Sequence, residues 1–187
     1  MPPESPELIH SQDPARQTDG TLISSAYFCK VLQTLSRFAR LQGLEADAEA
    51  YDRQAETMKE AFNRRFLTIK TGTSPRPEHL LYPDSVYYGN NSVTSNILPL
   101  AFNLVPEEYR ETVTRQVIAT LITTNDTHIS CGVIGVQWLF GELCRMGRGD
   151  LAYRLASQES YPSYGYMVRQ GATTIWELWN EIGRAHV

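Results

Sequence analysis

The chain has 187 residues, 42% of them hydrophobic, and a formal net charge of −4, which fits one globular domain or part of one. This acidic balance argues against a nucleic-acid partner or an anionic membrane surface, and no apolar run is long enough to span a bilayer. The three cysteines are odd in number and lack CxxC spacing, so we expect no metal site and no disulfide framework, and we expect all three to be buried.

Two long amphipathic helices are expected in the first third of the chain. Residues 1–20 are rich in proline and polar groups, as is typical of a loop. The helical period then runs over residues 22–42, and Gly43 is a plausible stop. A second helix is predicted over residues 46–66. The side chains expected to face the core are Ile23, Tyr27, Val31, Leu35 and Phe38 in the first helix and Tyr51, Ala55, Met58, Phe62 and Phe66 in the second.

The middle of the chain is predicted to be a long loop followed by two helices. Glycine, proline and asparagine over residues 68–91 favour a loop with room for a short strand or two. Residues 92–106 favour a third helix that is kinked near Pro99, because proline removes a donor and clashes with the preceding turn. Pro106 suits the first turn of a fourth helix. That helix carries Tyr109, Val113, Val117 and Leu121 on one face.

The last third contains two more predicted helices and an irregular end. Residues 132–147 form an almost wholly apolar fifth helix, which we expect to be buried on most sides. Asp150 is expected to cap a sixth helix. Residues 160–176 break the helical period and are expected to be a loop or a short strand. The pattern is therefore one of helix hairpins, and six such helices could make either a small bundle or half of a ring of helix pairs.

The segment "GATTIWELWN", Gly171 to Asn180, places Glu177 between Trp176 and Trp179. From composition alone, a glutamate between two tryptophans is more often a packed or hydrogen-bonded structural residue. Neighbouring indoles also remove water from a carboxylate, and desolvation raises a carboxylate pKa toward useful basicity. The segment therefore allows both a structural and a catalytic interpretation.

The stretch from His128 to Asn180 closely resembles the C-terminal half of the catalytic domain of bacterial α-L-rhamnosidases, glycoside hydrolase family 78. The resemblance is carried by "DLAY" from Asp150, "PSYGYM" from Pro162 and "GATTIWELW" from Gly171, in this order. Upstream segments are similar too, so that the resemblance covers residues 2–180. Tyr164 stands where the family usually has tryptophan, and Leu178 stands where it usually has arginine.

The resemblance implies an all-α fold in which the helix hairpins form about half of an (α/α)6 barrel, with long loops and room for short strands at one end. It also implies hydrolysis of terminal α-L-rhamnose residues with inversion, Glu177 being the general base. A rhamnose-containing glycoside is the expected partner, and no cofactor or metal is expected. The expected substrate contacts are Trp176, Trp179 and Tyr164, which suit the apolar faces of a deoxy sugar, and His128, which could bond a hydroxyl or equally a loop carbonyl.

The resemblance further implies that the chain is partial. The family's general acid lies in an acidic motif that residues 1–187 do not match, and a full barrel needs about twice the helices predicted here. We therefore expect residues 1–181 to be a partial catalytic domain that does not hydrolyse rhamnosides alone. Residues 182–187 read as the translation of a common sequencing adapter and are expected not to be native. The first ten residues lack a signal-peptide layout, and the compartment stays open.

Two alternatives to a rhamnosidase are compatible with the residues. One is another (α/α)6 glycosidase or lyase that acts on a different sugar. The other is a non-catalytic carbohydrate-binding or structural helical module, in which Glu177 only orients a sugar or packs.

Overall fold

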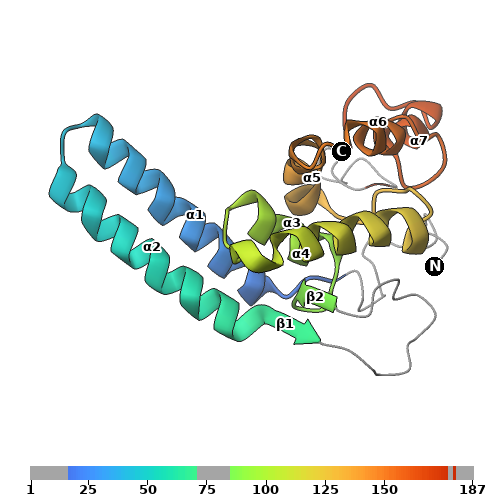
Figure 1. The fold of residues 1–187 in the computed structure, drawn as a ribbon. Coiled ribbons are helices and arrows are strands. Elements are labelled where there is room, and N and C mark those ends of the chain that lie inside the picture. Colours follow the sequence, from blue (N-terminus) through green and yellow to red (C-terminus); the bar gives the residue numbers. More distant parts are fainter. Residues whose placement is uncertain (1–16, 71–84, 177–178, 180–187) are drawn as a thin grey trace.

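The computed structural model describes residues 17–70, 85–176 and 179. These residues form helix hairpins, as predicted, with one two-stranded sheet (Figure 1). The elements in chain order are α1 (Gly20–Leu41), α2 (Glu45–Phe66), β1 (Leu67–Lys70), β2 (Ser85–Tyr88), α3 (Val93–Ala101), α4 (Glu107–Ala119), the π-helical turn η1 (Thr120–Thr124), α5 (Val133–Arg145), α6 (Gly149–Ala156) and α7 (Tyr164–Arg169).

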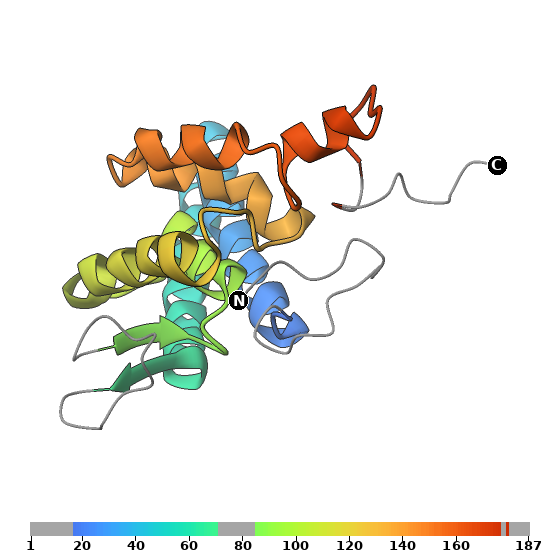
Figure 2. The ribbon, with the colours of Figure 1, turned by 90° about the vertical axis from the view of Figure 1, so that its right-hand side faces the viewer.

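The segments that precede α1, α3, α5 and α7 lie at one end of the helices, which Figure 2 turns toward the viewer. Thr18 Oγ1 and Ser92 Oγ are 2.6 Å apart, which joins the segments before α1 and α3. His128 Nε2 and Ser160 Oγ are 2.7 Å apart, which joins the segments before α5 and α7. We call this end the rim and define it as residues 17–19, 88–92, 125–132 and 157–163.

The first helix buries only part of the predicted face, because Ile23 and Tyr27 pack against the core as predicted and the later residues do not. The buried residues of α1 are mostly small or aliphatic, namely Leu22, Ala26, Cys29, Leu32, Ser36 and Ala39. The predicted core residues Val31, Leu35 and Phe38 are 49%, 38% and 60% exposed. Two faces of α1 therefore carry apolar residues, and the structure covers the one that contains the small side chains. The second helix is as predicted, because Phe62 and Phe66 are buried.

Two short strands frame the predicted long loop. β1 pairs antiparallel with β2, with Leu67 opposite Tyr88, and the residues between the strands lie outside the described ones. The Tyr88 hydroxyl donates to Asn63 Oδ1 at 2.5 Å, and the Tyr88 backbone N–H donates to Asn96 Oδ1 at 2.8 Å. Burial raises the pKa of the Tyr88 phenol, so that this residue acts as a neutral donor. These bonds attach the sheet to α2 and to the start of α3.

The third and fifth helices approach each other closely at their first turns. A Cβ on Gly135 would collide with Thr94 Oγ1 and would lie 2.8 Å from Cys131 Cβ. Farther along α5, the buried carboxylate of Glu142 accepts from Arg110 Nη2 at 3.2 Å and from Arg145 Nε at 2.7 Å. A buried carboxylate requires such partners. Arg110 connects α5 to α4, whereas Arg145 pairs with Glu142 within α5.

The fourth helix follows its predicted pattern, because Val113, Val117 and Leu121 are fully or almost fully buried. Its N-cap is Pro106, and Pro99 lies inside α3 shortly before that helix ends. No helix within residues 17–70 and 85–176 is both long and apolar enough to cross a membrane.

Other predictions in the last third of the chain are wrong. Val133 and Ile134 of α5 are exposed, because neighbouring elements cover only one side of this helix. Residues 164–169 form α7 rather than a loop, because Ser163 caps the turn by accepting from the Tyr166 N–H.

Two further predictions also need correction. Asp150 does not cap α6 but forms a two-bonded ion pair with Arg148, which lowers the pKa of the Asp150 carboxyl to about 2. Cys144 is exposed on α5, whereas Cys29 and Cys131 are buried as predicted.

Substitution of the two glycines inside α5 tests the close approach of α3 and α5. Gly135→Ala is expected to lower the free energy of unfolding by about 1–3 kcal/mol, because the new methyl group overpacks the contact with Thr94 and Cys131. Gly141→Ala is the matched control, because a Cβ there meets no atom within 4 Å. The control is expected to be neutral or stabilising by up to about 1 kcal/mol through helix propensity. Denaturant unfolding of both variants gives the comparison, and an equal response would contradict the packing.

Candidate functional site

The loop from Asn125 to Gly132 is a compact part of the rim. Asp126 and Thr127 adopt left-handed backbone angles, with φ values of 47° and 57°. The Thr127 N–H donates to Leu121 O at 2.9 Å, and Asn125 Nδ2 donates to Ser130 Oγ at 2.6 Å. The loop also buries Asn125, Thr127, Ile129 and Cys131. Its polar groups are bonded within the loop and to η1, and its alternate side chains are buried. The loop is therefore well fixed and can hold residues that pack against it in place.

Trp179 is attached to this loop and to α7. Its indole Nε1–H donates to the Cys131 carbonyl oxygen at 2.9 Å. Its ring lies 5.2 Å from the Tyr164 ring, and the Tyr164 ring lies 6.1 Å from that of Phe140 on α5. Trp179 therefore packs against the core beside the residue that precedes the start of α5 by two positions.

Trp176 is half-buried and has a different environment. Its Nε1 atom is buried and has no hydrogen-bond partner in the described part of the chain. A cavity of about 390 Å³ lies close to Trp176 in the sequence, because Ile175 is one of its lining residues. The full lining is Tyr164, Met167, Val168, Ala172, Thr173, Thr174 and Ile175. The cavity is lined by hydroxyl-bearing residues together with apolar ones.

Glu177 and Leu178 lie outside the described residues. Two of the predicted sugar contacts, Trp179 and Tyr164, are in ring contact, and Trp176 is the residue directly before Glu177. The structure therefore brings Tyr164 and Trp179 together next to the first turns of α5 and α7, and the role of Glu177 stays a prediction.

His128 lies in the same loop and has both ring nitrogens engaged. Nδ1 is 2.8 Å from the Asp126 carbonyl oxygen, and Nε2 is 2.7 Å from Ser160 Oγ. Since a carbonyl only accepts, Nδ1 must carry the proton, and in the neutral ring Nε2 accepts from the Ser160 hydroxyl. His128 therefore bonds its own loop and the loop before α7.

The sequence prediction missed three groups that hold this region together. They are the Cys131 carbonyl, the Ser160 hydroxyl and Gln158, whose Nε2 donates to the Thr127 carbonyl at 3.1 Å. A backbone carbonyl leaves no mark in a sequence, and serine and glutamine are common in loops. Only the pairing of the two rim loops identifies these groups.

The region is weakly polar around the aromatic rings. Burial raises the pKa of the Cys131 thiol to about 12, which keeps it neutral. Burial, and secondarily the proximity of Cys131, raise the pKa of Tyr164. Among the described residues, no group of three His, Cys, Asp or Glu side chains is arranged to hold a metal ion.

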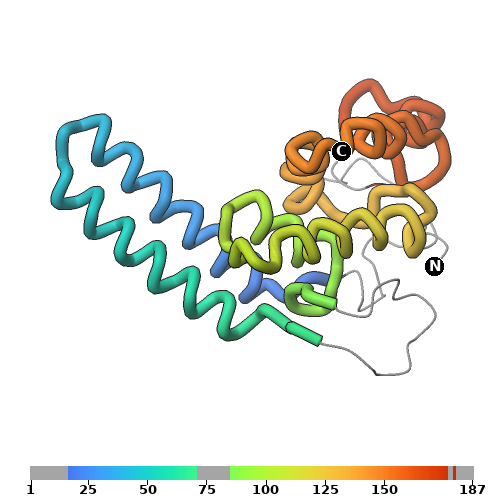
Figure 3. The backbone as a smooth tube through the Cα atoms, viewed as in Figure 1, coloured from blue at the N-terminus to red at the C-terminus, as the bar shows by residue number. Residues whose placement is uncertain are grey.

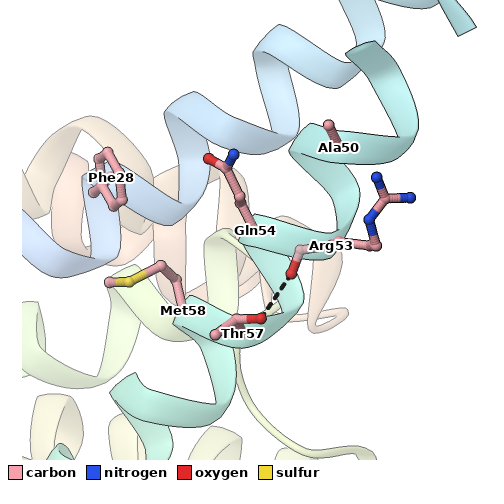
Figure 4. Close-up of a pocket in the computed structure, with 6 residues that line it drawn as sticks. All are labelled: Phe28, Ala50, Arg53, Gln54, Thr57 and Met58. Atoms are coloured by element: carbon pink, nitrogen blue, oxygen red, sulfur yellow. Dashed lines mark hydrogen bonds between the residues drawn. The ribbon is translucent and has the colours of Figure 1, made fainter. Parts of the chain in front are cut away.

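A second hollow, of about 450 Å³, lies between α1 and α2 (Figure 4). Phe28 of α1 lines it together with Ala50, Arg53, Gln54, Thr57 and Met58 of α2. Thr57 Oγ1 donates to the Arg53 carbonyl at 2.9 Å, a bond within one helix. The hollow contains none of the predicted site residues, and we assign the candidate site to the rim.

Comparison with known proteins agrees with the resemblance. A family model described as the bacterial alpha-L-rhamnosidase 6 hairpin glycosidase domain matches residues 4–186. An alpha-L-rhamnosidase of Alteromonas sp. (strain LOR) is 33% identical over 163 residues, which cover 87% of this chain and 16% of that relative.

Solved structures give the same result. The alpha-L-rhamnosidase from Dictyoglumus thermophilum is similar with a TM-score of 0.76 and 35% identity, over 93% of this chain and 18% of that chain. The Streptomyces avermitilis alpha-L-rhamnosidase complexed with L-rhamnose is similar with a TM-score of 0.75 and 28% identity, over 95% of this chain and 15% of that one. These likenesses confirm the predicted part of an (α/α)6 barrel, and the chain spans only about a sixth of the length of the relatives it matches.

Cysteine labelling tests the environment of the Cys131 carbonyl. With iodoacetamide at pH 8, Cys144 is expected to react quickly in the folded chain, while Cys29 and Cys131 react only after denaturation. The reason is burial, which also raises the pKa of both buried thiols above the value of an exposed cysteine. Peptide mass spectrometry identifies the labelled positions, and Cys144→Ser is the control that should remove fast labelling. Fast reaction of Cys131 would contradict the packing at the start of α5.

Proposed function

Because the chain belongs to the bacterial α-L-rhamnosidase six-hairpin glycosidase family, we propose that it is part of the catalytic domain of an enzyme that hydrolyses terminal α-L-rhamnose residues. The observation that carries the proposal is the bond from Trp179 to the Cys131 carbonyl. It holds Trp179, which follows Glu177 by two positions in the sequence, against the rim loop that precedes α5. A site that combines several such loops can surround a sugar from more than one side.

Glu177 is the proposed general base. An inverting glycosidase uses one carboxyl group to protonate the leaving oxygen and a second carboxylate to activate water on the opposite face of the sugar. The two groups are about 6.5–9.5 Å apart, which leaves room for that water. Tryptophans on both sides of Glu177 in the sequence favour a poorly hydrated carboxylate, and desolvation raises its basicity.

The two tryptophans take different proposed roles. Trp179 packs on Tyr164 and uses its N–H within the protein, so that it chiefly supports the segment. Trp176 keeps a buried N–H without a partner among the described residues, and this group suits a sugar hydroxyl. Tyr164 lines the adjoining cavity and offers an aromatic face to the methyl group of a deoxy sugar. We do not extend a sugar contact to His128, because both of its ring nitrogens are already bonded.

The general acid of the reaction is proposed to come from a part of the enzyme outside residues 1–187. The proposal rests on two observations: the chain spans about a sixth of the length of its relatives, and it contains no match to the family's acidic motif. An inverting site with only one of its two carboxyl groups cannot protonate the leaving group.

Removal of the proposed base tests the assignment in the longer enzyme that contains this chain. Glu177→Gln is expected to lower kcat on an aryl α-L-rhamnoside by about 10²–10⁴-fold, because the amide cannot accept a proton from water. Sugar affinity, measured by calorimetry with L-rhamnose, is expected to change little. The matched control is Glu49→Gln on the exposed face of α2, whose side chain is paired with Arg53 outside the rim and is expected to leave turnover unchanged. Near-normal turnover of Glu177→Gln would reject Glu177 as the base. If the unsubstituted longer protein binds rhamnose but does not hydrolyse the rhamnoside, a non-catalytic module is favoured.

The purified 187-residue chain is expected to release no rhamnose from the same aryl rhamnoside. The reason is the missing general acid rather than a failure to fold, so far-UV circular dichroism should accompany the assay. Hydrolysis by a folded sample would contradict the proposed division of the site, and release of another sugar in a glycoside panel would identify a different glycosidase.

A further inference from the structure

The bonds around the candidate site form a closed circuit of contacts. Starting from His128, the path crosses to Ser160 in the loop before α7. The chain then leads to Tyr164, whose ring meets that of Trp179 at 5.2 Å. Trp179 donates to the Cys131 carbonyl, three residues after His128 in the same loop. Tyr164 and Trp179 are therefore fixed from two directions by one loop.

The loop that closes this circuit is well suited to a supporting role. Its left-handed residues Asp126 and Thr127 hold it in a tight shape, and Ile129 is fully buried. A second bond, from Gln158 Nε2 to the Thr127 carbonyl, runs beside the bond between His128 and Ser160. The loop before α7 is thus attached at two points, on either side of its Glu159.

We propose that His128 is a positioning residue that acts through Ser160 to hold Tyr164 and Trp179, the latter of which follows Glu177 by two positions in the sequence. In this role His128 does not contact the sugar. Its Nδ1–H anchors the ring to Asp126 O, and its Nε2 presents an acceptor to the neighbouring loop. The catalytic consequence rests on the proposed function of Glu177, whereas the positioning of Trp179 does not.

Two conservative variants separate the two ring nitrogens. His128→Gln retains an acceptor with the reach of Nε2 and can still receive the Ser160 hydroxyl. His128→Asn retains a donor near Nδ1 for Asp126 O but does not reach Ser160. If the bond between the loops positions Trp179, His128→Gln retains the native position of Trp179. His128→Asn then displaces Trp179 in the same way as Ser160→Ala does.

The readout is the indole N–H signal of Trp179 in a ¹⁵N–¹H spectrum of the chain, assigned with Trp179→Phe. His128→Asn and Ser160→Ala are expected to shift this signal and to speed its exchange with solvent by about five-fold, while His128→Gln leaves it unchanged. Because both changes break the same bond, the double variant His128→Asn/Ser160→Ala should shift the Trp179 signal no further than either single variant does. The internal control is the Trp138 indole, which donates to the Tyr27 hydroxyl at 2.9 Å and lies outside the circuit.

An unchanged Trp179 signal in both His128→Asn and Ser160→Ala would overturn the proposal, as would equal effects of His128→Gln and His128→Asn. If a His128 variant also displaces the Trp138 signal, the fold itself has changed, and Ser160→Ala decides, since it removes only one hydroxyl group. This test needs no enzymatic activity.

Turnover in the longer enzyme extends the test to catalysis. His128→Asn is expected to lower kcat by about ten-fold or more with little change in KM, and His128→Gln is expected to restore it. A selective rise in KM with an undisturbed Trp179 signal would identify His128 as a direct sugar ligand and overturn the proposal. A longer enzyme without rhamnosidase activity would reject the proposed function, while the Trp179 signal would still decide the positioning role.

Discussion

The close approach of α3 and α5 at Gly135 is the constraint on which the rest of the rim depends. Only a hydrogen atom fits between this position and Thr94, so the first turns of the two helices lie against each other. The segments that enter these helices must then gather at the same end. The Tyr88 network fixes one of them, and the buried groups of residues 125–132 fix the other. Helix packing thereby determines where loop chemistry can take place.

The rim is held together by hydrogen bonds between distant segments of the chain. The residue types that form them are mostly common in loops, but each one has a specific partner. Trp179 reaches a backbone carbonyl, Ser160 meets a histidine, and Gln158 meets another carbonyl. Each bond joins residues that are more than thirty positions apart in the chain. Such bonds favour a single arrangement of the aromatic rings, and a preorganised arrangement is what a glycosidase needs for its base and its water.

The sequence predicted the helix hairpins well, because strong 3.6-residue periodicity in residues such as Val113 and Val117 reports burial directly. It failed for α1, where two apolar faces compete and periodicity cannot tell which neighbour each one meets. It also failed for α7, since six residues are too few for a period to emerge. The motif around Glu177 located the candidate site through resemblance, but the role of His128 depends on Ser160, a contact that no local pattern encodes.

The exposed flank of α1, with Val31 and Phe38, bears on how such a barrel assembles. In a ring of hairpins, each pair gains most of its stability from the pairs on either side, as in linear repeat proteins. A pair with few contacts to other elements opens at a lower free energy than a pair in the interior. The α1–α2 pair extends away from the other helices of the described chain (Figure 3). Its tip near Gly43 is therefore where we expect the chain to start to unravel.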